Sequence, residues 1–200
     1  MLKILFSSSA RVKILTLFMM NPRDRFYQRQ ISEFTDLPIR AVQREVEKLQ
    51  KLGLLERDAD GNRVYYQVNR EFALFPELKS MVLKTTGLGL ALHGLLENED
   101  KVQVAFVYGS YAADEEVTAS DVDLFVIGEL SSKELSVALS QARRSSQREI
   151  NYTLFAPDEF SEKAHRRNNF LMSVLQGPKV FLKGDEDALQ QLAAARENTT

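Results

Sequence analysis

Cysteine is absent from the 200 residues of this sequence, and histidine occurs only twice, at His93 and His165. The absence of cysteine excludes disulfide bonds and cysteine-based zinc sites. The two histidines are isolated from each other, which argues against a metal cluster built from imidazoles. Disulfide scaffolds and zinc-finger folds are therefore excluded.

The sequence also lacks a long apolar run: no stretch reaches the roughly 18 residues that suggest a membrane-spanning helix. The N-terminal segment MLKILFSSSARVKILTLFMM is interrupted by Lys3, Arg11 and Lys13, so it predicts an amphipathic helix of the fold and not a signal peptide. The composition, 44% hydrophobic and 27% charged, is ordinary for a globular protein. We therefore expect a cytoplasmic protein with no membrane partner.

The small net charge of −2 hides an uneven distribution along the chain. Residues 1–84 contain 15 Lys and Arg against 10 Asp and Glu, whereas residues 85–200 contain 11 against 18. A basic half joined to an acidic half predicts two domains with different partners. Nucleic acid is the first candidate partner for the basic half.

The basic half has the residue pattern of three helices followed by a β-hairpin. The first helix is expected over residues 9–20, the second over 28–34 with Ile31 and Phe34 facing inward, and the third over 39–52. Thr35 or Asp36 is expected to cap the third helix. The hairpin follows, with strands over 54–57 and 63–68 and a turn over 58–62, DADGN, built on Asp60 and Gly61.

This order resembles the winged helix-turn-helix DNA-binding domains of bacterial and archaeal transcription regulators. The resemblance implies that the third helix enters the major groove of double-stranded DNA. Arg40, Gln43 and Arg44 would then contact base edges, and Lys48, Lys51 and Arg63 would contact phosphates. By analogy with such regulators we expect a homodimer. The alternative is an ordinary charged helix surface on which Glu45 and Glu47 offset the basic residues.

The acidic half contains a Gly-Ser turn directly after an apolar strand, followed by two aspartates one residue apart. The strand is KVQVAFVY, residues 101–108; Gly109 and Ser110 follow, and Asp121 and Asp123 open the next strand. Side chains at positions i and i+2 of a strand share one face, so both carboxylates point to the same side. Two carboxylates together with substrate phosphates are a common way to hold Mg²⁺, which makes a nucleoside triphosphate the natural partner. Ser110 is expected to cap a short helix. The alternative is a serine cap beside a solvated acidic turn.

The pattern of strand, Gly-Ser turn and D-x-D strand resembles the minimal nucleotidyltransferases of the polymerase-beta superfamily over roughly residues 86–183. The resemblance implies that Gly109 and Ser110 hold the triphosphate and that Asp121 and Asp123 carry the metal ions for in-line phosphoryl attack. The family usually has a third carboxylate on the following strand, where this chain has Asn151. Glu149, two residues earlier, is a displaced substitute. The chain also has three acids after the turn, at residues 114–116, where related enzymes tend to carry glycine and basic residues.

The remaining patterns predict alternating helices and strands in one small mixed sheet. We expect helices over 86–96, 132–145, 157–176 and 186–195, and strands over 121–127, 148–155 and 179–183, with Ser131 and Glu134 forming a capping box. The expected fold class is α+β. It combines an N-terminal winged helix-turn-helix over 1–70, a connector over 71–85 and a small mixed-sheet α/β nucleotidyltransferase-like domain over 86–200.

Two functions follow from this organisation. In the first, the protein is a DNA-binding regulator whose transferase-like domain binds Mg²⁺ and a nucleotide with reduced activity. In the second, it is an active Mg²⁺-dependent transferase that modifies a hydroxyl of a protein, RNA or small molecule and controls its own gene. A transferase of this second type resembles the small transferases that act as antitoxins, and this resemblance implies a toxin-like partner protein.

Overall fold

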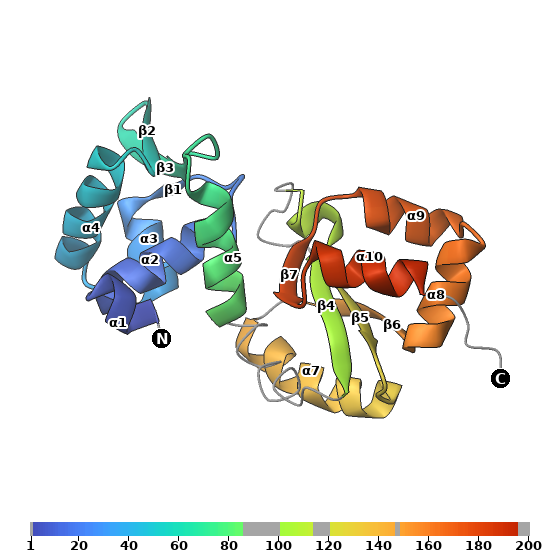
Figure 1. Ribbon diagram of the computed structural model, residues 1–200. Coiled ribbons are helices and arrows are strands. Elements are labelled where there is room, and N and C mark those ends of the chain that lie inside the picture. Colours follow the sequence, from blue (N-terminus) through green and yellow to red (C-terminus); the bar gives the residue numbers. More distant parts are fainter. Residues whose placement is uncertain (1, 86–100, 114–120, 147–148, 196–200) are drawn as a thin grey trace. The chain divides into compact units, whose positions relative to one another are not determined.

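The computed structural model describes residues 2–85, 101–113, 121–146 and 149–195 of the chain, which divides into two compact units (Figure 1). The first unit ends at residue 86 and the second contains the later described residues. The helix expected over 86–96, with His93, and the acidic stretch at residues 114–116 lie outside the described residues. Among the helices that are described, none is long and apolar enough to cross a membrane.

The N-terminal unit consists of helices around a small antiparallel sheet. Its helices are α1 (Leu2–Phe6), α2 (Ser9–Met19), α3 (Gln28–Thr35), α4 (Ile39–Lys51) and α5 (Phe75–Thr85), and its strands are β1 (Phe26–Tyr27), β2 (Leu55–Asp60) and β3 (Arg63–Val68). The strand order is β1-β3-β2. Three helices followed by a hairpin are therefore present as the sequence predicts, together with α1 and β1, which were not expected separately.

The core of this unit is built from the apolar faces of α2 and α4. Val12, Leu15 and Phe18 of α2 are buried, and so are the α4 residues at the matching three- and four-residue spacings, Val42, Val46 and Leu49. On β3, Tyr66 packs inward while Tyr65 lies on the outer face of the hairpin against the ring of Tyr27. The spacing of apolar residues therefore identifies the buried faces correctly at their centres.

At the edges of these faces several predictions are wrong. Phe34 is 60% exposed, because Ile31 and Thr35 form the buried side of α3 and position 34 lies beside it. Ile39 and Leu52, the apolar end residues of the helix expected over 39–52, are also exposed. Asp36 does not cap α4: its left-handed backbone, with φ 51°, ends α3.

The helix expected over 9–20 is confirmed as α2, and Ser8 caps it by accepting a hydrogen bond from the Arg11 amide at 3.1 Å. The segment before it and the hairpin differ from expectation: a separate helix, α1, ends before Ser7, which has a φ of 51°. The hairpin strands run as far as the pair Asp60 and Arg63, so the turn contains only two residues, with Gly61 at φ +59°. Cross-strand pairing thus extends into the stretch predicted as a turn.

The C-terminal unit is a four-stranded mixed sheet with helices on it. Its strands are β4 (Val102–Tyr108), β5 (Val122–Gly128), β6 (Ile150–Phe155) and β7 (Val180–Lys183), and its helices are the 3₁₀ turn η1 (Gly109–Tyr111), α7 (Ser132–Ser146), α8 (Pro157–His165), α9 (Asn169–Gln176) and α10 (Glu186–Ala194). The strand order is β6-β5-β4-β7, with β5 and β6 parallel and the other pairs antiparallel. Helices α8, α9 and α10 pack on one face, and α7 lies on the other side (Figure 1).

The helix termini of this unit follow the predicted caps with one exception. Ser131 and Glu134 form the expected capping box, with Ser131 N donating to the Glu134 carboxylate at 2.8 Å and Glu134 N donating to Ser131 Oγ at 3.2 Å. Asp185 caps α10 through the Ala188 amide at 2.8 Å. The helix predicted over 157–176 is instead divided into α8 and α9, because Arg167 has a φ of 50° and Asn168 caps a new helix through the Leu171 amide.

Candidate functional site

The two aspartates of the D-x-D pattern lie at the beginning of β5. Asp121 precedes the strand and is exposed, Val122 is buried in the core, and Asp123 is half-buried. Asp123 is paired with Tyr108, the last residue of the neighbouring antiparallel strand β4. Strand alternation therefore places both carboxylates on one side, beside the end of β4.

Gly109 brings the turn after β4 against the second of these aspartates. Its φ is +71°, and a Cβ built on it would lie 2.7 Å from Asp123 Oδ2. Real Cβ atoms essentially never show such a contact, so only glycine fits without displacing the carboxylate. The Gly-Ser turn and Asp123 thus form one compact feature.

Ser110 lies inside η1 and does not cap a helix. The amides of Ala112 and Ala113 both donate to the Gly109 carbonyl, at 3.1 and 3.0 Å, so the helical turn begins at the glycine. The predicted capping role of Ser110 is therefore wrong. Its half-exposed side chain remains next to the glycine that contacts Asp123.

Asn151 occupies the position on the next strand that faces Asp123. The parallel register of β5 and β6 pairs Asp123 with Asn151, and Asn151 Nδ2 donates towards Asp121 Oδ2 at 3.5 Å. Glu149 precedes β6, is exposed, and contributes its carbonyl oxygen to the Val122 amide at 3.0 Å. The residue closest to both aspartates in register is therefore an amide and not a carboxylate.

Aromatic residues that were not predicted from the sequence lie on the same face of the sheet as this carboxylate pair. The hydroxyl of Tyr108 lies 3.3 Å from Thr153 Oγ1 of β6, so the Tyr108 side chain spans β5. Its ring packs edge-on against Phe125 and against Phe170 of α9, with centroids 6.0 and 6.2 Å apart. The pairing of Tyr108 with Asp123 places it on this face, whereas its contact with α9 depends on tertiary packing.

No group of three or more His, Cys, Asp or Glu residues capable of holding a metal lies within the part of the chain that the structure describes. The available donors are the carboxylates of Asp121 and Asp123 and the amide oxygen of Asn151. These are hard oxygen donors of the kind that Mg²⁺ accepts when phosphates and waters complete its coordination. The residues present therefore fit a cation that arrives with a phosphorylated ligand.

In the N-terminal unit, the outward face of α4 carries Arg40, Gln43, Arg44, Lys48 and Lys51, all exposed. Within the described ranges, no carboxylate forms an ion pair with Arg40, Arg44 or Lys51. Lys48 differs, since its Nζ lies 3.1 Å from Glu45 Oε1. Most of the positive charge on this face is therefore available to a ligand.

Glu45 points away from that face into the unit. It is 7% exposed and accepts a hydrogen bond from Arg11 Nε of α2 at 2.9 Å. Burial alone would raise the pKa of Glu45, but the hydrogen bonds from Lys48 and Arg11 outweigh it and hold the pKa below its ordinary value. Glu45 thus forms an ion pair with Arg11 of α2, and among the basic residues named on the outer face of α4 it neutralises the charge of Lys48 alone.

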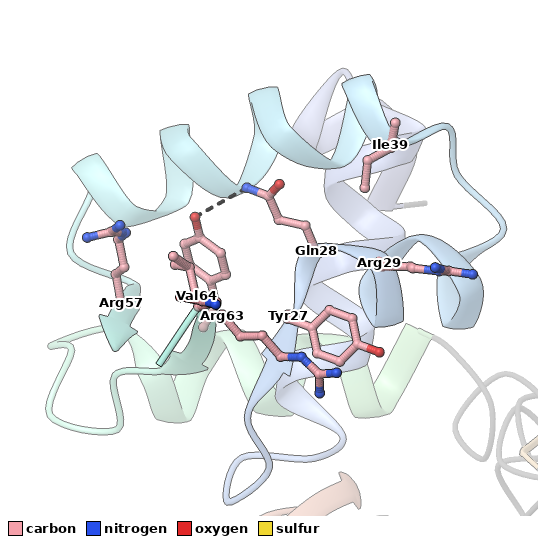
Figure 2. Close-up of a pocket in the computed structure, with 9 residues that line it drawn as sticks. Tyr27, Gln28, Arg29, Ile39, Arg57, Arg63 and Val64 are labelled. Atoms are coloured by element: carbon pink, nitrogen blue, oxygen red, sulfur yellow. Dashed lines mark hydrogen bonds between the residues drawn. The ribbon is translucent and has the colours of Figure 1, made fainter. Parts of the chain in front are cut away.

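A pocket of about 470 Å³ lies between the beginnings of α3 and α4 and the hairpin (Figure 2). Arg29 of α3, Arg57 of β2 and Arg63 of β3 line it, and no Asp or Glu does. The guanidinium of Arg63 lies 5.2 Å from the centre of the Tyr27 ring, and Gln28 Nε2 donates to the Tyr66 hydroxyl at 3.3 Å. Of these three arginines, Arg63 was predicted as a DNA contact and Arg29 and Arg57 were not, because nothing in their spacing along the sequence shows that they share a pocket.

Figure 2 shows how these arginines are distributed. Arg57 and Arg29 lie towards opposite ends of the view, with Arg63 and Tyr27 between them. Guanidinium groups spread along an open pocket suit a ligand with several separated negative charges. The pocket adds positive charge next to the first turn of α4, where Ile39 also lines it.

Comparison with known proteins identifies part of the chain. Residues 91–187 match the family Polymerase beta, Nucleotidyltransferase. This region contains the Gly-Ser turn, both aspartates and Asn151, so the second unit contains a nucleotidyltransferase-like domain.

Two solved structures are also similar to the chain. A possible transcriptional regulator from Methanosarcina mazei Go1 is 18% identical over 50% of this chain and 85% of its own, with a TM-score of 0.33. Human N-acetylserotonin methyltransferase in complex with SAM is 12% identical over 86% of this chain and 42% of its own, with a TM-score of 0.30. No curated protein matches.

Proposed function

We propose that this protein is a DNA-binding transcriptional regulator whose C-terminal unit binds a nucleotide with Mg²⁺ and transfers nucleotidyl groups poorly or not at all. The observation that carries the proposal is the pairing of Asp123 with Asn151. Two carboxylates that can donate oxygen to a cation lie on one side of the sheet. The neighbouring position, where nucleotidyltransferases of this family usually have a third carboxylate, is occupied by an amide.

The DNA-binding part of the proposal is supported by the order of elements and the charge on α4. Three helices are followed by a hairpin, the order of elements in a winged helix-turn-helix, and in such a domain α4 would be the helix that enters the major groove. Arg40, Gln43 and Arg44 near its N-terminal end would contact base edges. Lys48, Lys51 and Arg63 would contact phosphates, and the pocket adds Arg29 and Arg57 to that set.

The nucleotide-binding part is supported by the contact between the Gly-Ser turn and Asp123. Asp121 and Asp123 would hold Mg²⁺, and Gly109 and Ser110 would lie along the triphosphate. When bound, the metal neutralises phosphate charge and aligns the reacting groups. Without a side chain at residue 109, the backbone can approach the phosphates closely while Asp123 keeps its position.

Reduced transfer follows from the chemistry of Asn151. A general base must accept the proton of the attacking hydroxyl, and a neutral amide cannot do so. The Nδ2 group of Asn151 instead donates towards Asp121. The residue in register with the metal-binding pair therefore supports the charge of the carboxylates without supplying a base.

The second candidate is an active transferase that modifies a hydroxyl of a protein, RNA or small molecule and represses its own gene. It is favoured by the presence of both aspartates and the glycine contact, and by Glu149 two residues before Asn151 at the exposed start of β6. In that case Glu149 would have to act as the base, about 7 Å further along the strand. A toxin-like protein would be the natural acceptor and partner.

Two measurements on the intact protein test the proposal. We expect calorimetry to detect ATP binding only with Mg²⁺ present, and we expect retention of duplex DNA that falls steeply with salt. Incubation with α-labelled ATP, Mg²⁺ and cell extract should leave macromolecules unlabelled. A labelled macromolecule would favour the active transferase, and no nucleotide binding at all would remove the nucleotide role.

A further inference from the structure

Phe170 is a large aromatic residue that remains 47% exposed on the first turn of α9. Exposing a phenylalanine to water is unfavourable, and here the ring lies on the same face of the sheet as the carboxylate pair. Asn168 fixes the start of the helix by accepting a hydrogen bond from the Leu171 amide at 3.1 Å. The position of Phe170 is therefore set by a capped helix end.

Tyr108 connects this ring to the carboxylates. It is the strand partner of Asp123, and its ring packs edge-on against Phe170 with an interplanar angle of 74°. The contact of its hydroxyl with Thr153 and the packing of its ring on Phe125 hold the side chain from two further directions. Tyr108 is half-buried, so part of it remains accessible next to the more exposed Phe170.

We propose that Phe170, held in place by its edge-on contact with Tyr108, forms an aromatic shelf that stacks the base of a nucleotide bound through its phosphates at Asp121 and Asp123. This inference rests on the proposed nucleotide binding and adds the part of the site that recognises the base. Nucleobases stack on aromatic side chains through their π-faces, and such stacking tolerates every base. The shelf selects a nucleotide over a bare polyphosphate, with little preference among bases.

The test compares two ligands that differ only in having a nucleoside. Intact protein is titrated calorimetrically with ATP and with inorganic tripolyphosphate, each with Mg²⁺. We expect Phe170→Ala to weaken ATP binding by about tenfold, the order that stacking of one base on one ring supports, and to leave tripolyphosphate binding unchanged. Phe170→Leu, which keeps apolar area without a π-face, should lose most of the same affinity.

Val137→Ala is the matched control, because Val137 is also a large exposed apolar residue but lies on α7. It should change neither affinity. Thermal unfolding of each variant shows whether the fold is retained.

The outcomes separate the shelf from the site as a whole. Equal affinity of the unchanged protein for ATP and tripolyphosphate would overturn the shelf and leave the phosphate and metal site intact. Equal weakening of both ligands by Phe170→Ala would overturn it as well, since the residue would then act on the fold. Binding of neither ligand by the unchanged protein would overturn the nucleotide role and the shelf together.

Discussion

The two units present their functional side chains in contrasting ways. On α4, long basic side chains project from an exposed helix face, and Arg40, Arg44 and Lys51 have no acidic partner among the described residues. At the start of β5, short carboxylates are fixed by strand pairing, with Asn151 and Gly109 directly beside them. A polyanion can be attracted by flexible charges at some distance, whereas a small cation needs oxygen atoms at fixed positions.

The strongest test of this contrast replaces the charged side chains of one unit and measures both nucleotide binding and DNA binding. Asp121→Ala with Asp123→Ala should lower Mg²⁺-dependent ATP affinity by more than about 100-fold, because the proposed cation ligands are removed. Its affinity for duplex DNA should not change. Glu129→Ala, an exposed acid just beyond the other end of β5, is the control that should retain nucleotide binding.

The reciprocal variant is Arg40→Ala with Arg44→Ala. We expect duplex DNA affinity to fall by about 100-fold at moderate salt, and discrimination among sequences to relax, because we propose that both residues contact base edges. ATP binding should be unaffected. If the double variant retains DNA as well as the unchanged protein, the surface that contacts DNA is not α4.

A third variant tests the role of Asn151 within the carboxylate site. Asn151→Asp restores a carboxylate in register with Asp123 and should raise any transfer from labelled ATP by at least about tenfold, below the full contribution of a well-placed general base. Asn151→Ala should give no gain. Transfer by the unchanged protein that is lost in Glu149→Gln would instead assign the base to Glu149.

Gly109→Ala tests the contact between the turn and Asp123. The left-handed backbone alone costs a residue with a Cβ about 1–2 kcal/mol, and the 2.7 Å approach to the carboxylate adds to that cost. We expect a lower free energy of unfolding together with weaker ATP binding. Gly61→Ala has a similar φ of +59° but nothing within 4 Å of its Cβ, so it should lose stability without losing ATP affinity.

The smallest expected effect concerns the cap of α7. A hydrogen bond from Lys101, followed by those from Ser131, holds the pKa of Glu134 at about 2, below its ordinary 4.5. A carboxylate with a lowered pKa stabilises the folded state above pH of about 4.5, and that contribution is lost as the pH falls towards 2. The difference in unfolding temperature between the unchanged protein and Glu134→Gln should therefore be constant near neutral pH and vanish in strong acid.

Features that depend on local spacing could be predicted from the sequence. The two-residue period of strands predicted that Asp121 and Asp123 share one side. The resemblance to nucleotidyltransferases aligned Asn151 with the family's third carboxylate, and in the structure Asn151 is in register with Asp123. Caps such as Ser131 with Glu134 and Asp185 are equally local, since donor and acceptor are three residues apart. The structure agrees with the sequence on these points.

Features that depend on contacts between distant segments could not be predicted. The exposure of Phe34 follows from which residues of α3 meet the core, and the pocket unites arginines from α3, β2 and β3. The break between α8 and α9 follows from the left-handed backbone of Arg167. No glycine or proline at this position indicates the break in the sequence. The packing of Phe170 on Tyr108 joins segments about sixty residues apart.

The ion pair between Arg11 and Glu45 limits how α4 can move. If α4 rolled about its axis, the Glu45 carboxylate would leave the guanidinium of α2 and remain without that partner at a largely buried position. The orientation of α4 in which Arg44 and Lys48 face outward is therefore fixed before any ligand binds. A surface held ready in this way spends less conformational entropy on association, so more of its interaction energy is expressed as affinity.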